Sequence, residues 1–359
     1  MIEQGVESYF PLPDTELFLY YRLWGNPGGI PLLFVHGGPG NDVDHYKKIN
    51  SKLFQPEKYY VVEVDQRGTG KSTPAVRDDF DNMRKYMDIS MEKMSADFDH
   101  LREHLRIEKW LVFGGSWGST LGLDYAERYP SRCLGLIARG IFLNTLSEFD
   151  AIYSRRSFEG NDRCLKEFDI FLELAQQEAA RKGEPSLDGN DSERFIRLYE
   201  DMILSGNREA MWRFYVFESN LADEDPADRT DPFVIDENIF PEAVTVSFFE
   251  CRLFLRGTFE EPVDLLAAVG KLKQVPVWVI QGMGDGVCPD IYARQLVQRL
   301  DEEGITNKSF FVDAGHRASS NGIFLALQEA LEEFYNQHTL ILQEAQEVTT
   351  LDSATQIAK

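Results

Sequence analysis

Gly114-Gly115-Ser116-Trp117-Gly118 follows the apolar run 110–113 and precedes a helix-like stretch from Ser119 to Tyr129. A G-x-S-x-G pattern between a strand and a helix is typical of a nucleophile elbow, in which a sharp turn lifts a serine hydroxyl clear of a sheet. The flanking glycines tolerate the backbone angles that this turn requires. We therefore predict that Ser116 is a catalytic nucleophile.

The base that would activate Ser116 follows from chain order, because an elbow serine takes its acid and then its base from later segments. Of the six histidines, only His316 and His338 follow Ser116. His338 lies in a stretch of helical periodicity without turn residues, whereas His316 follows a short apolar strand and a glycine. Catalytic groups commonly lie on loops at strand ends. His316 is therefore the predicted base.

The acid is expected at the end of the strand before His316. Residues 275–281 are apolar enough for a buried parallel strand. The glycine-rich loop that follows carries Asp285, which we expect to orient the imidazole and stabilise its protonated form. Asp290 is the alternative acid, although a carboxylate in the first turn of a helix also has a purely structural explanation.

Acyl transfer requires hydrogen-bond donors for the oxyanion. The backbone N–H of Trp117, directly after the nucleophile, is one expected donor, and a second should come from the loop after an earlier strand. The apolar run 32–36 leads into Gly37-Gly38-Pro39-Gly40, whose small residues allow close approach of backbone amides. We place the second donor at Gly37, with Gly38 as the alternative.

Composition excludes several classes of protein. A net charge of −23 over 359 residues opposes binding to nucleic acids. Absence of a long apolar run predicts no membrane span, and the polar start predicts a cytoplasmic protein. Gly70-Lys71-Ser72 resembles the end of a nucleotide-binding loop, but Asp65 stands where its first glycine is required, so no nucleotide is expected.

The cysteines likewise predict neither a metal centre nor a disulfide framework, because their spacing matches neither. They are Cys133, Cys164, Cys251 and Cys288. We therefore expect an enzyme without metal or cofactor, and its oligomeric state stays open.

Strand and helix signals divide the chain into segments. Strand-like and helix-like runs alternate within residues 1–142 and again within 263–340, which predicts an α/β fold with a mostly parallel sheet covered by helices on both faces. Residues 143–262 show helical periodicity with few strand signals, as expected of an inserted helical cap over the active site. The tail, 341–359, is polar and weakly patterned, and we expect fraying or partner contacts there.

Four motifs resemble one known family. HGGPG at 36–40, DQRGTGKS at 65–72, GGSWGSTL at 114–121 and RGIF at 139–142 are together similar to the proline iminopeptidase family of α/β hydrolases. The resemblance implies a serine exopeptidase that removes an N-terminal proline from peptides with a free amine. It also implies Ser116, Asp285 and His316 as the catalytic triad.

The same resemblance implies a site for the substrate amine. Segment 212–219 resembles a family motif that supplies one glutamate from the cap, and segment 249–254 resembles a second. These matches point to Glu218 and Glu250 as amine-binding residues, since two carboxylates facing one pocket favour a cation. Phe142 and Phe254 are expected to line the pocket for an apolar ring.

Both cap segments also depart from the family pattern. Phe217 and Ser219 replace a tryptophan and a glycine, and Arg252-Leu253 replace His-Tyr. Arg252 could pair with one of the cap glutamates. The departures leave open another chemistry on the same triad, such as an esterase, amidase or lactone hydrolase acting on a small metabolite. A non-catalytic ligand-binding protein on this fold is a third alternative, which an intact triad opposes.

Overall fold

The computed structural model describes residues 2–13, 15–222 and 229–357. Within that part, an eight-stranded sheet has the order β1-β2-β4-β3-β5-β6-β7-β8. Strand β2 pairs antiparallel with both β1 and β4, and all the other pairings in the sheet are parallel. The strands are β1 Ile2–Pro11, β2 Phe18–Gly25, β3 Ile30–Val35, β4 Tyr59–Val64, β5 Trp110–Ser116, β6 Cys133–Ile141, β7 Val277–Gly282 and β8 Asn307–Val312.

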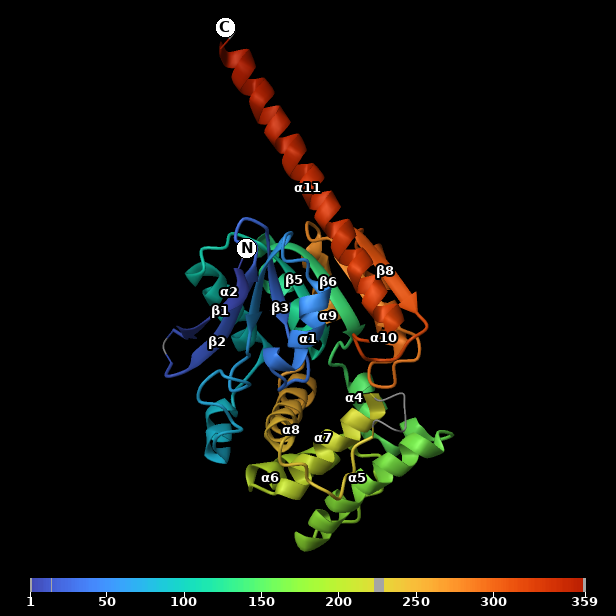
Figure 1. The fold of residues 1–359 in the computed structure, drawn as a ribbon. Coiled ribbons are helices and arrows are strands. Elements are labelled where there is room, and N and C mark those ends of the chain that lie inside the picture. Colours follow the sequence, from blue (N-terminus) through green and yellow to red (C-terminus); the bar gives the residue numbers. More distant parts are fainter. Residues whose placement is uncertain (1, 14, 223–228, 358–359) are drawn as a thin grey trace.

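Helices cover both faces of this sheet (Figure 1). They are α1 Val43–Leu53, α2 Met91–His104, α3 Trp117–Arg128, α4 Leu146–Tyr153, α5 Asp162–Arg181, α6 Ser192–Leu204, α7 Arg208–Ala222, α8 Phe240–Leu255, α9 Leu265–Ala268, α10 Asp290–Glu302 and α11 Asn321–Ile357. Shorter helical turns are η1 Phe80–Tyr86, η2 Pro130–Arg132, η3 Arg155–Phe158, η5 Arg256–Glu260 and η6 Val269–Leu272.

Alternation along the buried strands produces two cores, one on each face. In β3, Leu33 and Val35 pack on the side of α2, α3 and α10, whereas Leu32 and Phe34 pack on the side of α1 and α11. Successive strand side chains point to opposite faces, so a strand buried on both sides must be apolar throughout. The expected α/β-hydrolase fold with a mostly parallel sheet is thus confirmed.

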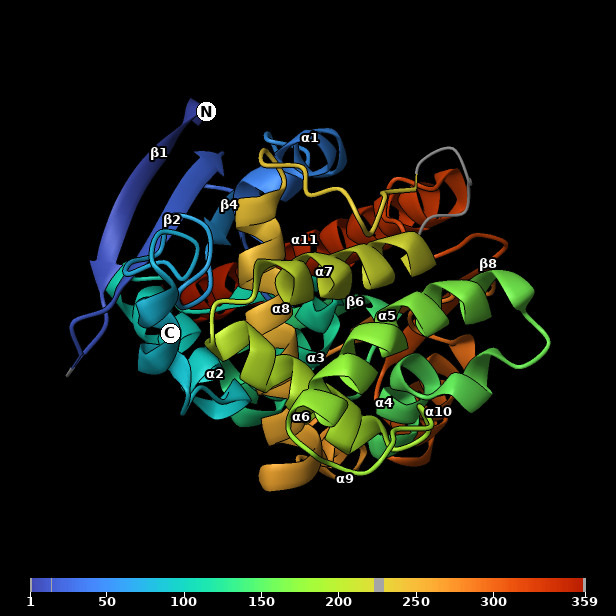
Figure 2. The ribbon, with the colours of Figure 1, turned by 90° about the horizontal axis from the view of Figure 1, so that it is seen from below.

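Helices α4 to α8 form the helical insert between β6 and β7, at the carboxyl ends of the central strands (Figures 1 and 2). An aromatic cluster holds these helices together. The ring of Phe217 on α7 stacks on that of Phe171 on α5, with centroids 4.5 Å apart and planes inclined by 12°. Phe217, one of the departures from the family motif, therefore belongs to the interior of the insert.

Two elements differ from the sequence expectations. Strand β1 is absent from the sequence expectations, because its largely polar residues carry a weak strand signal. In the structure β1 is an edge strand that pairs with β2. Helix α11 does not stop before the tail but continues to Ile357, beyond the body of the protein (Figure 1). Among the described helices, none is long and apolar enough to cross a membrane.

Candidate active site

Ser116 lies at the turn between β5 and α3, with φ 57° and ψ −130°. A positive φ is uncommon for a residue other than glycine and marks a strained turn of the kind found at functional sites. Neighbouring backbone leaves no space for side chains on either side. A Cβ on Gly114 would stand 2.0 Å from the Gly118 carbonyl oxygen, and one on Gly118 would stand 2.2 Å from that of Val35.

His316 and Asp285 form a hydrogen-bonded pair, with 2.8 Å between Nδ1 and Oδ2. The other carboxylate oxygen of Asp285 accepts the backbone N–H groups of Val287 and Cys288 at 2.9 and 2.8 Å. Burial opposes ionisation of Asp285, but His316 and these two amides outweigh it and hold its pKa below the ordinary value. Asp285 is therefore a fixed anion beside the imidazole.

A residue of the sheet also anchors the loop that carries His316. Arg139, near the end of β6, donates from Nη1 to the His316 carbonyl oxygen at 2.6 Å. Asp290, the alternative acid, instead pairs with Arg294 one turn along α10. The structure thus places Asp285, not Asp290, against the imidazole.

Ser116 and His316 line one cavity of about 540 Å³, together with Trp117, Phe142 and Phe254. No hydrogen bond joins the Ser116 hydroxyl to His316 among the described residues, and Cys288 lines the same cavity. Hydrogen bonds between nucleophile and base are often long without substrate and tighten when it binds.

The glycine loop after β3 lies against the elbow. A Cβ on Gly37 would stand 3.5 Å from the Ser116 Cβ and 2.8 Å from the Tyr46 hydroxyl, which explains why a glycine is needed there. Gly37 therefore lies beside Ser116, and Gly38, the alternative donor, lines the same cavity.

A chain of hydrogen bonds joins this loop to the elbow. The backbone N–H of Gln66 donates to His36 Nε2 at 3.0 Å, which leaves His36 Nδ1 protonated to donate to the Gly37 carbonyl at 3.0 Å. The Gln66 amide donates to the His36 carbonyl at 2.8 Å and accepts from the Trp117 indole at 3.2 Å. Burial lowers the pKa of His36 to about 4, so the ring stays neutral.

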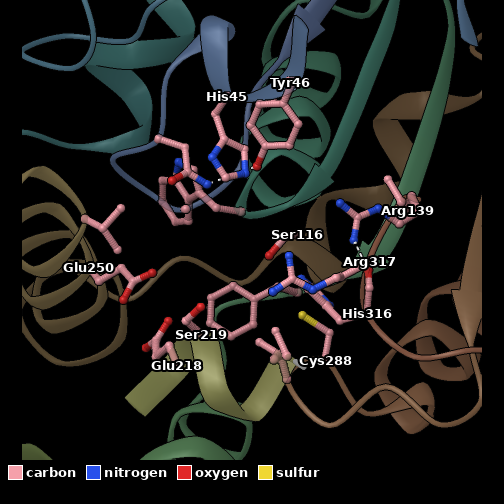
Figure 3. Close-up of a pocket in the computed structure, with 18 of the residues that line it drawn as sticks. His45, Tyr46, Ser116, Arg139, Glu218, Ser219, Glu250, Cys288, His316 and Arg317 are labelled. Carbon is pink, nitrogen blue, oxygen red and sulfur yellow. Dashed lines mark hydrogen bonds between the residues drawn. The ribbon is translucent and has the colours of Figure 1, made fainter. Parts of the chain in front are cut away.

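Glu218 on α7 and Glu250 on α8 line the same cavity, opposite the His316 loop (Figure 3). The two carboxyl groups interact, and each affects the pKa of the other. The Tyr153 hydroxyl also donates to Glu218. Burial raises the pKa of Glu218, although its interactions with Glu250 and Tyr153 oppose the rise. Burial and the neighbouring charge of Glu218 act together on Glu250 and raise its pKa well above the usual value. We assign the shared proton to Glu250.

Glu250 has one more feature that points to a ligand. Its Oε2 atom is buried and has no hydrogen-bond partner within the described structure. An unpaired polar atom in this position costs free energy, of the order of 1–3 kcal/mol, unless something binds it. The free oxygen belongs to a residue that lines the cavity, so a donor within the cavity could satisfy it.

Sequence reasoning missed several residues of this site, namely Tyr153, Gln66, Cys288, Arg139, His45 and Tyr46. Tyr153 ends a helix of the insert far from any motif, and no local pattern marks it. Gln66 and Arg139 lie within the quoted motifs, so closer attention to those motifs could have found them. Asp285, Cys288 and His316 also bring three possible metal-ligand atoms within 4.8 Å, the one such group among the described residues.

Comparisons with known proteins show which family the chain belongs to. A family model described as alpha/beta hydrolase fold matches residues 30–322. The "Probable proline iminopeptidase" of Leptolyngbya boryana is 33% identical over 333 residues, covering 91% of this chain and 94% of that protein. This chain belongs to the proline iminopeptidase family of α/β hydrolases.

Other members of the proline iminopeptidase family match over a similar length. The "Proline iminopeptidase" of Neisseria meningitidis serogroup B is 30% identical over 325 residues, 88% of this chain and 92% of that protein. Among solved structures, a proline iminopeptidase-related protein from Thermus thermophilus has a TM-score of 0.53 at 19% identity, over 92% of this chain and 97% of that one. At that identity the likeness concerns the fold.

One departure from the proline iminopeptidase motifs has a clear structural role. Arg252 does not pair with Glu218 or Glu250. Its guanidinium bonds to Glu200 on α6, at 2.7 Å from Nη1 to Oε1, and to Glu260 in η5. Arg252 therefore ties three segments of the helical insert together and leaves the pair of carboxyl groups in the cavity available.

Proposed function

We propose that this protein is a serine exopeptidase that releases an N-terminal proline, or a similar small residue, from peptides. The observation that carries the proposal is the Glu218–Glu250 pair, which lines the same cavity as the strained Ser116. A secondary ammonium offers two N–H donors, and the pair offers a charged oxygen on Glu218 and the unpartnered oxygen of Glu250. The names of the related proteins support the same substrate.

Fixing the amine in this way sets which bond is cleaved. A peptide whose first nitrogen is held at the glutamates presents its first carbonyl carbon to Ser116, one residue along the chain, because charge-assisted bonds fix both distance and direction. Phe142 and Phe254, with ring centroids 5.1 Å apart, form an apolar part of the cavity wall against which a pyrrolidine ring can pack.

In the proposed reaction the Ser116 oxygen attacks the carbonyl carbon while His316 accepts the hydroxyl proton. Asp285 stabilises the resulting imidazolium, and the N–H groups of Trp117 and Gly37 receive the negative oxygen. The carbon–nitrogen bond then breaks, and His316 returns the proton to the leaving amine. Water, deprotonated by His316, cleaves the acyl-enzyme to release free proline and the hydroxyl of Ser116.

The direct test compares three chromogenic substrates: proline anilide, N-acetylproline anilide and a simple aryl ester. We expect cleavage of the free-amine anilide alone, because acetylation removes the charge that Glu218 binds. Ser116→Ala should retain the fold and lose activity by several orders of magnitude. Ester cleavage with both anilides untouched would instead indicate the esterase alternative, and turnover by the Ser116→Ala variant would contradict the mechanism.

A further inference from the structure

The active-site cavity has a buried end and an open end. Glu250, at the buried end, has only 2% of its surface exposed. The exposed lining residues include Lys48 and Lys52 on α1 and Arg317 beside His316. If the amine of a peptide occupies the buried end, the chain beyond the scissile bond must leave through the open end. That end therefore contacts the leaving part of the substrate.

Positive charge gathers at this open end. Lys48 and Lys52 are one helical turn apart, so they share one face of α1. Neither lysine has its ammonium nitrogen within 4.0 Å of a carboxylate oxygen among the described residues. Arg317 lies on the opposite wall of the cavity, next to the catalytic loop (Figure 3). Such a concentration of cations runs against the net charge of −23.

The one described carboxylate that lines the cavity near α1 is already engaged. Glu242 on α8 pairs with His45 on α1, with 3.1 Å between Oε1 and Nδ1. Burial opposes protonation of His45, but its bond to Glu242 outweighs this and raises its pKa. The pair bridges the insert and the core, so Glu242 is already occupied, and the two lysines have no ion-pair partner among the described residues.

We propose that this cationic mouth, formed by Lys48, Lys52 and Arg317, binds a carboxylate of the substrate on the leaving-group side of the scissile bond. The inference rests on the proposed function. The carboxylate is either the C-terminus of a short peptide or an acidic side chain near the new N-terminus. In this arrangement the ammonium of the substrate binds the two glutamates and its carboxylate binds the cationic mouth. The scissile bond lies at Ser116, between these two contacts.

The experiment measures kcat/KM for Pro-Ala, Pro-Ala-Ala and Pro-Ala-Ala-Ala, each with a free C-terminal carboxylate and as the C-terminal amide. Pro-Glu-amide beside Pro-Gln-amide tests the side-chain source. We expect at least one carboxylate substrate to exceed its neutral match by about five-fold, the order expected of two or three solvent-exposed ion pairs. The preference should shrink as salt is added.

The variant Lys48→Gln/Lys52→Gln should reduce that preference and leave the cleavage of the neutral amides unchanged. Lys47→Gln is the matched control, because Lys47 lies on the same helix but does not line the cavity. Equal rates for all matched pairs in the unaltered protein would overturn the inference, as would an unchanged preference in the double variant. Failure to cleave any proline substrate, the anilide included, would contradict the proposed function instead.

Discussion

The indole Nε1 of Trp117 donates a hydrogen bond of 3.2 Å to the side-chain oxygen of Gln66. The same Gln66 is bonded twice to His36, once through its backbone and once through its side chain. One glutamine thus connects the residue after Ser116 with the residue before Gly37. Gln66 therefore links the segments that carry the two expected oxyanion donors, Trp117 and Gly37, although Gln66 itself does not line the cavity.

Replacing Gln66 by leucine should therefore impair catalysis more than binding. We expect kcat for proline anilide to fall by about 10- to 100-fold with little change in KM, because loss of a complete oxyanion donor costs roughly 100- to 1000-fold and a displaced donor costs less. Gln176→Leu is the control, since Gln176 is an exposed glutamine of α5 that donates to the Leu187 carbonyl. An unchanged kcat would show that the Trp117–Gln66 bond does not position the donors.

The two glutamates of the cavity should respond differently to the same substitution. Glu250 carries the shared proton, so Glu250→Gln replaces a neutral carboxyl by a neutral amide of similar shape. Glu218 carries the charge, so Glu218→Gln removes the partner of the ammonium. We expect kcat/KM for proline anilide to fall by about 100-fold or more in Glu218→Gln, since a charged pair in a cavity is worth about 3 kcal/mol, and by roughly 10-fold or less in Glu250→Gln.

Steady-state kinetics of the two variants at one pH decide this point. Tyr153→Phe provides a further check, because it removes a donor that favours the ionised form of Glu218 without changing the volume of the cavity. Equal losses in Glu218→Gln and Glu250→Gln would contradict the assignment of the proton.

Glu127 on α3 makes the stability of the fold depend on pH. Burial and the nearby carboxylates of Asp124 and Asp264 raise its pKa to about 9, against the opposing effects of Lys271 and Arg128. Between its ordinary pKa near 4.5 and this value, the unfolded chain is ionised there while the folded chain keeps the proton. The folded state thus loses up to about 1.4 kcal/mol per pH unit as the pH rises.

Glu127→Gln removes this dependence, because glutamine does not titrate. The melting temperature of the variant should exceed that of the unaltered protein by an amount that grows from pH 5 to pH 9. Glu103→Gln, at an exposed glutamate of α2, is the control and should show no such trend. A difference in melting temperature that stays constant over this range would refute the account.

Arg252 should matter for stability and not for binding of the amine. Arg252→Met leaves Glu200, 8% exposed, without its 2.7 Å partner, and loss of one member of a buried pair costs about 3 kcal/mol. Denaturant unfolding measures that loss. KM for proline anilide should stay within about two-fold, since Arg252 contacts neither cavity glutamate.

Arg197→Met is the matched control for this prediction. Arg197 also pairs with Glu260, but its side chain is 41% exposed, so its loss should cost little. A large rise in KM with unchanged stability in Arg252→Met would mean that Arg252 acts on the substrate site after all.

Much of this protein was predictable from its sequence because the deciding features are local. The backbone of one turn requires the glycines around Ser116. Strand-like runs that alternate with helix-like runs indicate a mostly parallel sheet without any knowledge of long-range contacts. Chain order left His316 and His338 as candidates, the local sequence around each separated them, and the quoted motifs led to the correct family. The structure pairs Asp285 with His316 and places Ser116 and His316 in one cavity, at the carboxyl ends of β5, β7 and β8.

Tertiary structure alone decided which distant side chains meet. The bond between Tyr153 and Glu218, the place of the proton on Glu250 and the pairing of Arg252 with Glu200 depend on how helices far apart in the chain pack. Such contacts leave no local pattern, because a side chain's partner is set by the three-dimensional packing and its charge state by the burial that results. The sequence thus determined which reactive groups this protein has. The packing of its helices and strands determined the positions and charge states of the side chains that a substrate would contact.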